Sequence, residues 1–183
     1  MDWSKAKTLL IVALLVTDLV LGGFLLHGKT VQRQNERKAA ENIGNYLVDL
    51  GAELNCELAD DSRMLPVLFI SFPEGSDTSE YSEEAELYYN EIPVIVSGYV
   101  SGTPTLDAEG ASRGDIRPSA YAAAELAGEL MAGGRGDLSG LSIDSIDLVY
   151  WLYYSGSGTS DTAFPYWRFN TSEGAYFVSA YYE

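Results

Sequence analysis

A nearly unbroken apolar run from Leu9 to Leu26 constrains this chain more than any other feature of its 183 residues. Eighteen residues in a helix span roughly 27 Å, close to the hydrocarbon thickness of a bilayer. Thirteen of them are Leu, Ile, Val or Phe, worth roughly −5 kcal/mol together on an insertion scale, whereas the central acid, Asp18, costs about 3 kcal/mol. We therefore expect residues 9–26 to insert as a transmembrane helix.

A cleaved signal peptide is the alternative interpretation of this run. Cleavage requires small residues at two alternate positions after the apolar core. Around Gly22 and Gly23 the bulky Leu21, Phe24 and Leu25 crowd the candidate positions. This favours retention of residues 9–26 as an anchor that follows a short tail over residues 1–8.

The flanking charges leave the orientation of the anchor open. Two lysines precede the span, and four bases follow it: Lys29, Arg33, Arg37 and Lys38. A bare count of bases favours a cytoplasmic C-terminal domain. Glu36 and Glu41 dilute the second group, however, and long domains can translocate regardless of flanking charge. Charge alone favours neither orientation.

Asp18 is the candidate site within the anchor. An ionisable residue at mid-bilayer is usually kept for a partner helix, a proton path or a polar cavity. One membrane helix cannot form an internal path, so the acid must be protonated, tolerated by the lipid or in contact with another helix. Leu14 and Gly22 lie on the same face one turn to either side, and Gly22 allows close approach of a second helix. We therefore expect Asp18, Leu14 and Gly22 to form a helix–helix contact.

The rest of the chain is strongly acidic. Residues 1–38 hold six Lys or Arg and three Asp or Glu, whereas residues 39–183 hold five Arg and 24 Asp or Glu. Phosphate contacts would be repulsive on such a domain, so nucleic acid is excluded as a partner. A flat orientation on anionic lipid is disfavoured for the same reason.

Periodicity predicts an α+β protein in which a helix over 29–51 leads into one domain over 52–183. Ile43, Leu47 and Leu50 mark the apolar stripe of that helix, and Gly51 is a typical stop. We expect strands over 67–72 and 92–100 and a turn-rich connection over 102–117. The segment 74–91, with seven acids and no base, is expected to form an exposed loop with a helical turn over 83–89.

The clearest local unit covers residues 116–183 and has the order α-β-β-β. A helix is expected to begin at Pro118-Ser119, to bury a stripe of small and apolar side chains, to expose Glu125 and Glu129, and to end at Gly133-Gly134. The buried stripe comprises Ala120, Ala123, Leu126, Ala127 and Leu130. Three strands are expected over 143–154, 163–170 and 175–182, joined by hairpin turns into an aromatic-rich antiparallel sheet that packs on the helix.

Residues that could carry catalysis are scarce. The only histidine, His27, lies at the membrane boundary, which removes Ser-His-Asp and Cys-His arrangements and multi-His metal sites. Cys56 is expected to be a small buried residue, and the acids of 74–91 lack the spacing of a calcium loop. The tyrosines of the strands are expected in the core, with a contact surface as the alternative. We expect no enzymatic activity, cofactor, metal or small-molecule substrate.

Both ends of the chain resemble the YycI regulatory proteins of Gram-positive bacteria. At the N-terminus the resemblance rests on Met1-Asp2-Trp3-Ser4-Lys5-Ala6-Lys7-Thr8 and the apolar span with Asp18. At the C-terminus it rests on Pro118-Ser119-Ala120, Ile146-Asp147-Leu148-Val149-Tyr150, Phe164-Pro165-Tyr166-Trp167-Arg168 and Tyr176-Phe177-Val178-Ser179-Ala180. It covers roughly 1–50 and 116–183, and the C-terminal motifs are shared more loosely with PepSY-like domains.

The resemblance implies a single-pass membrane protein with a cytoplasmic N-terminus and a non-enzymatic extracytoplasmic domain. Proteins of this family act with the related YycH protein on the sensor histidine kinase WalK (YycG), which belongs to a two-component system that controls cell-wall metabolism. The resemblance also implies contact through the membrane helices, in agreement with the interpretation of Asp18. Two alternatives stay open: a PepSY-like binding or inhibitory domain that acts on an extracytoplasmic peptidase, and a membrane-tethered cell-wall hydrolase that uses two carboxylates.

Overall fold

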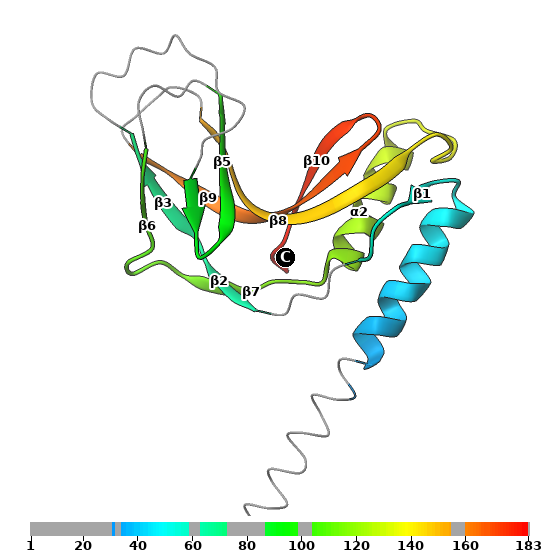
Figure 1. Cartoon of the computed structure of the whole chain (residues 1–183), viewed down its shortest axis with the longest axis horizontal. Coiled ribbons are helices and arrows are strands. Elements are labelled where there is room, and N and C mark those ends of the chain that lie inside the picture. Colours follow the sequence, from blue (N-terminus) through cyan, green and yellow to red (C-terminus); the bar gives the residue numbers. More distant parts are fainter. Residues whose placement is uncertain are drawn as a thin grey trace, which may run out of the picture. The chain divides into compact units, whose positions relative to one another are not determined.

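A computed structural model describes residues 31, 34–58, 63–72, 87–98, 104–154 and 160–182 of the chain. Residues Ala40–Glu183 form one compact unit, a predominantly β structure with helices, which confirms the predicted α+β class (Figure 1). The expected tail over 1–8 and transmembrane helix over 9–26 lie outside the described residues. Among the helices that are described, none has the length and apolar character needed to cross a membrane.

The first described helix covers residues 34–49 and ends as predicted at Gly51. Gly51 adopts φ +97°, its amide donates to the carbonyl oxygen of Val48 (2.9 Å), and the Ala52 amide donates to that of Leu47 (3.0 Å). These two bonds form a Schellman motif, which satisfies carbonyl groups that a helix end leaves unpaired. Leu47 is fully buried in the core, and Ile43 and Leu50 are half-buried against it, which confirms the predicted stripe.

An eight-stranded mixed sheet, strongly curved in Figure 1, forms the centre of the domain. Its main path follows the order β4-β5-β8-β9-β3-β6, with β1 paired to β8 and β10 paired to β9. The strands are β1 (Glu53–Leu54), β3 (Leu68–Ser71), β4 (Leu87–Tyr89), β5 (Ile92–Gly98), β6 (Thr105–Asp107), β8 (Ser142–Tyr154), β9 (Ser160–Thr171) and β10 (Gly174–Ser179). Two further strands, β2 (Met64–Pro66) and β7 (Arg113–Asp115), form a separate antiparallel pair.

The expectation of an antiparallel sheet is correct only for part of this structure. Strands β8, β9 and β10 are antiparallel neighbours, as predicted, but β1 and β5 both run parallel to β8. Parallel neighbours need a crossover connection. The chain between β5 and β8 provides one, because it passes through β6 at the other edge of the sheet and then through β7 and the helix α2 (Ser119–Ala132) before it enters β8.

The predictions for residues 52–115 need three corrections. Residues 87–89, expected in a helical turn, form β4, because Asn90 and Glu91 adopt φ +47° and +69° and turn the chain tightly into β5. Pro66 lies within β2, and β3 starts at Leu68, since the Val67 amide donates outside the sheet to the carbonyl oxygen of Ser112 (3.1 Å). The turn-rich connection includes the short strands β6 and β7.

The helix α2 begins directly after Pro118 and ends at Gly133, as the sequence predicts. Most of the predicted stripe is buried, with Leu130 only half-buried at its end. Glu129 is exposed as expected, and the Glu125 side chain is 36% exposed. The Glu125 carboxylate also forms an ion pair with Arg117 (2.6 Å). Arg117 is 11% exposed in its side chain and also donates to the Ser179 carbonyl oxygen (2.7 and 3.0 Å), so it joins the start of α2 to the end of β10.

The core lies between α2 and one face of the sheet, which we call the inner face. Tyr150 of β8 and Trp167 and Phe169 of β9 are fully buried there, as predicted. Each polar atom on these rings has a partner: the Tyr150 hydroxyl donates to the Pro66 carbonyl oxygen and Trp167 Nε1 donates to that of Arg117, both at 2.9 Å. We call the opposite face of the sheet, which lies away from α2, the outer face.

Candidate interaction surface

The three residues predicted to contact another membrane helix, Asp18, Leu14 and Gly22, lie outside the described residues. Most of the acidic segment 74–91 lies outside them as well, apart from residues 87–91. Within the described part of the chain, no group of three or more His, Cys, Asp or Glu side chains is placed to hold a metal ion.

Cys56 is half-buried, not fully buried as expected. Its thiol lies 3.8 Å from the carbonyl oxygen of Ile143, toward which it can donate a weak hydrogen bond. Burial, together with the nearby charges of Asp144 and Asp147, raises the pKa of the Cys56 thiol. Because the thiolate is the nucleophilic form, this environment makes Cys56 a weak nucleophile at neutral pH.

The outer face of the sheet carries a cluster of aromatic side chains. Paired residues of neighbouring strands project on the same face, and the register pairs Trp151 with Phe164 and Val149 with Tyr166 across β8 and β9. Tyr153 follows Trp151 at the next outward position of β8, and Phe177 of β10 pairs with Arg168 of β9. We call Trp151, Tyr153, Phe164, Tyr166 and Phe177 the aromatic patch.

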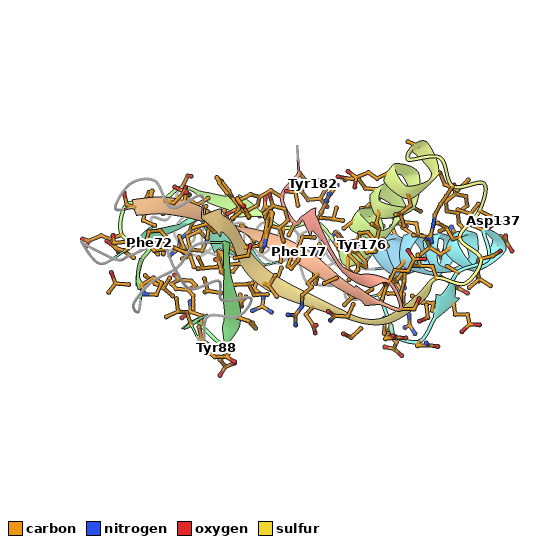
Figure 2. All side chains as sticks on the ribbon, turned by 90° about the horizontal axis from the view of Figure 1, so that it is seen from above. Phe72, Tyr88, Asp137, Tyr176, Phe177 and Tyr182 are labelled. Atoms are coloured by element: carbon orange, nitrogen blue, oxygen red, sulfur yellow. The ribbon has the colours of Figure 1, made fainter. Side chains whose placement is uncertain are left out.

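Ring contacts join three members of the patch, and the other two members are exposed to solvent. The Trp151 and Phe177 rings stack at a centroid distance of 5.1 Å, and Tyr166 meets Trp151 edge-on at 5.2 Å. Figure 2 shows Phe177 and its neighbour Tyr176 in the middle of β10. Tyr153 and Phe164 are 58% and 43% exposed. The patch therefore has a fixed Trp151 at its centre and exposed rings beside it.

Exposed aromatic residues also flank the patch on both sides. Phe69 of β3 pairs with Thr162 and is 40% exposed. Tyr88 of β4 pairs with Pro93 of β5, is 66% exposed, and projects away from the domain in Figure 2. The aromatic character of this face thus continues onto the neighbouring strands.

A polar network borders the patch along β8 and β9. Arg168 forms an ion pair with Asp147 (3.2 Å), and the Asn170 amide donates to Asp147 (2.8 Å) and to the Ser145 hydroxyl (2.7 Å). The side chains of Arg168 and Asp147 are 24% and 42% exposed. Their charges balance one another, so the network adds no net charge to the face.

Most of this surface was not expected from the sequence, because the tyrosines of the strands were expected in the core. Ile146, Leu148, Tyr150 and Leu152 do lie on the inner face of β8. A signal was present, because Trp151 and Tyr153 alternate with Tyr150 and Leu152, so large apolar side chains occupy both faces of the strand's last third. The alternative expectation, that some tyrosines form a contact surface, is consistent with the exposure of Tyr153.

A hollow of about 330 Å³ lies elsewhere, beside β7 and the C-terminal residues. The aromatic ring of Tyr181 forms one wall and lies so close to Gly114 that a β-carbon there would come within 2.9 Å of the ring. The Tyr181 hydroxyl donates to the Leu65 carbonyl oxygen (2.8 Å). Burial raises the pKa of Tyr181, so the hydroxyl stays protonated and serves as a structural joint between β2, β7 and the C-terminus.

Comparison of the chain with protein-family models, with curated proteins and with solved structures gives no match.

Proposed function

We propose that this chain is a non-enzymatic, membrane-anchored accessory protein that regulates a WalK-like sensor histidine kinase controlling cell-wall metabolism. The observation that carries the proposal is the resemblance of both ends of the chain to the YycI family: the Met1–Thr8 segment with its acid-containing apolar span, and the motifs of the C-terminal unit. The C-terminal motifs of the resemblance lie in the unit α2, β8, β9, β10, which has the α-β-β-β order that the sequence pattern predicts.

The proposed topology has residues 1–8 in the cytoplasm, residues 9–26 across the membrane and residues 52–183 outside the cell, as a YycI/YycH-like domain with a PepSY-like C-terminal unit. The acidity of residues 39–183 supports a domain that is held near the membrane by its anchor and not by lipid headgroups. A YycH-like protein is the proposed second partner, again on the resemblance.

Contact with the kinase is proposed to include the membrane helix. Asp18 is the residue with the strongest physical reason for a partner, because a lipid-exposed carboxyl group at mid-bilayer is costly. Leu14 and Gly22 on the same face complete the proposed contact, with Gly22 allowing close approach of the second helix.

The genes beside this one provide the first test. A neighbouring response regulator and histidine kinase would support the proposal, whereas a neighbouring extracytoplasmic peptidase would favour an inhibitory PepSY-like domain. Deletion of the gene should then change the phosphorylated fraction of the response regulator, measured in cells. An unchanged fraction under conditions that alter cell-wall synthesis would contradict a regulatory role.

The hydrolase alternative has a direct test of its own. Purified chain incubated with peptidoglycan should release no soluble fragments if the protein acts only through contact. Released muropeptides would show that the chain hydrolyses peptidoglycan and would favour the hydrolase alternative.

A further inference from the structure

We infer that the aromatic patch is the docking face for an extracytoplasmic protein domain whose contact surface is apolar at its centre and basic at its rim. The patch, as defined above, consists of Trp151, Tyr153, Phe164, Tyr166 and Phe177. The identification of that domain as part of the sensor kinase rests on the proposed function. The chemistry of the partner rests on the surface alone.

The composition of the patch matches the centre of a protein interface. Interface centres are enriched in Tyr, Trp and Phe and depleted of charge, and exposed apolar patches on soluble domains mark sites of interaction. Tyr153 and Phe164 present their rings to solvent, while Trp151 is fixed between Phe177 and Tyr166. Rings that are already held in place lose little conformational entropy when a partner binds, which favours affinity.

The distribution of charge around the patch defines the partner further. Among the outward positions of β5, β8, β9 and β10 that border or form the patch, the charged residues are Asp147 and Arg168, which pair with one another. Exposed acids lie near the ends of these strands: Glu91 in the turn before β5 and Asp144 near the start of β8. Asp161 at the start of β9 is also exposed, but it pairs with the buried Ile70 of β3 and so occupies an inner-face position outside this rim. A neutral centre with an acidic rim is complementary to an apolar centre with a basic rim.

The same charges argue against other occupants. A second copy of the chain would bring two acidic rims together, each on a molecule of net charge −16. Anionic lipid and nucleic acid would be repelled by the rim. A neutral glycan could stack on the exposed rings but would gain nothing from the acidic rim, so its binding would not depend on salt. A basic-rimmed protein would bind less tightly as salt rises, because salt screens exposed charge pairs.

Site-specific photocrosslinking in intact membranes tests the inference with the full-length chain. A photoreactive phenylalanine analogue replaces Tyr153 in one sample and Tyr121 in a matched control. Tyr121 lies on α2 and is also exposed, at 42%. We expect irradiation to join position 153, and not position 121, to one protein that mass spectrometry identifies as the histidine kinase.

Substitutions give the quantitative arm. Tyr153→Ser with Phe164→Ser should reduce co-purification of that protein by about 10-fold or more, as expected for exposed aromatic residues at an interface centre. Tyr121→Ser should leave co-purification unchanged. Both variants should keep the parent's melting temperature within a few degrees, because they remove exposed rings. Raising salt from 0.05 to 0.5 M should weaken binding of the parent.

The outcomes separate this inference from the proposed function. If the kinase co-purifies equally with the parent and with the double variant, the docking face is wrong while the proposed function stands. If position 153 crosslinks to a different, identified protein in a salt-dependent way and the double variant loses it, the proposed function is wrong while the docking face stands. Crosslinks between copies of this chain, salt-independent binding of a glycan, or no crosslink from position 153 would overturn the inference.

Discussion

Two buried aromatic side chains each use one polar atom to bind the backbone of a neighbouring element. The hydroxyl of Tyr150 and the indole nitrogen of Trp167 each donate to a backbone carbonyl oxygen, on Pro66 and Arg117 respectively. Both side chains are fully buried, where an unpaired donor would cost about 1–3 kcal/mol. The carbonyl partners lie in β2 and directly before α2, so these two bonds join the inner face of the sheet to both of these elements.

Tyr150→Phe tests one of these bonds and its dependence on pH. Burial and the nearby Tyr181 and Tyr89 raise the pKa of Tyr150, so the folded protein keeps a proton that the unfolded chain loses near pH 10. Stability from this group is therefore fully present below about pH 10 and declines as pH rises above it. We expect Tyr150→Phe to cost about 1–2 kcal/mol of unfolding free energy at pH 7 and to reduce the loss between pH 9 and pH 11.

Urea denaturation of the Ala40–Glu183 unit at several pH values provides the measurement. Tyr153→Phe is the matched control, because Tyr153 is exposed. Equal alkaline losses in the parent and in Tyr150→Phe would contradict the assigned role of the buried hydroxyl.

Asp18 is the residue with the largest predicted effect on assembly. A polar contact between membrane helices is worth about 0.6–2 kcal/mol, so it tunes association without accounting for all of it. Asp18→Leu should leave the protein inserted and its domain folded while weakening co-purification with partner membrane helices by about 3- to 30-fold. Asp18→Asn should be milder because an amide still donates and accepts, and Gly22→Leu should resemble Asp18→Leu if both lie on one packing face. If Asp18→Leu associates with the partner helices as strongly as the parent does, in mild detergent and in a two-hybrid assay in living cells, Asp18 is tolerated by the lipid without a partner.

The helices and the C-terminal strands were predictable because local patterns determine them. The alternation of β8, β9 and β10 and the Pro118 and Gly133 boundaries of α2 are readable from the sequence, and the structure has them within a few residues. Parallel pairing of β1 and β5 with β8 was not predictable, because partner choice depends on a crossover and not on local pattern. The aromatic patch was missed for a related reason: a strand with apolar side chains on both faces does not show which face is covered.

The end of the helix over 34–49 offers a test at the level of an element. Gly51 combines φ +97° with close approach to Ser139, whose hydroxyl oxygen would lie 2.7 Å from an added β-carbon. We expect Gly51→Ala to destabilise the domain by about 2–3 kcal/mol, partly through the left-handed backbone and partly through the clash. Gly110→Ala is the control, because Gly110 has φ +73° with no atom within 4 Å of an added β-carbon. It should cost only about 1 kcal/mol. Equal melting temperatures for the two variants would show that the contact with Ser139 does not matter.

At the scale of the whole molecule, charge and hydrophobicity divide the chain into parts with different environments. The first 26 residues include a run long enough for a membrane, and residues 39–183 hold 24 of the 27 acids. Anionic lipid headgroups would repel most of the surface of this acidic domain. Its nearly neutral aromatic face is suited to contact with a protein. The proposed contact through the membrane helix and the proposed docking face would then both bind the same partner.

The proposed topology predicts where protease can reach. Protease added to intact protoplasts should digest residues 39–183, because they are proposed to lie outside the membrane, while a cytoplasmic marker protein stays intact. Digestion after permeabilisation should then change nothing further for this chain. Protection of residues 39–183 in intact protoplasts would place the domain in the cytoplasm and overturn the assignment.

Quantitative co-purification of the tagged full-length chain from native membranes tests the central claim, that the protein acts through direct contact with a sensor histidine kinase. The comparison is with an unrelated single-pass protein that carries the same tag at the same expression level. The proposal predicts that the histidine kinase is enriched with this chain and not with the control. Enrichment of a peptidase, or of no histidine kinase, would contradict it.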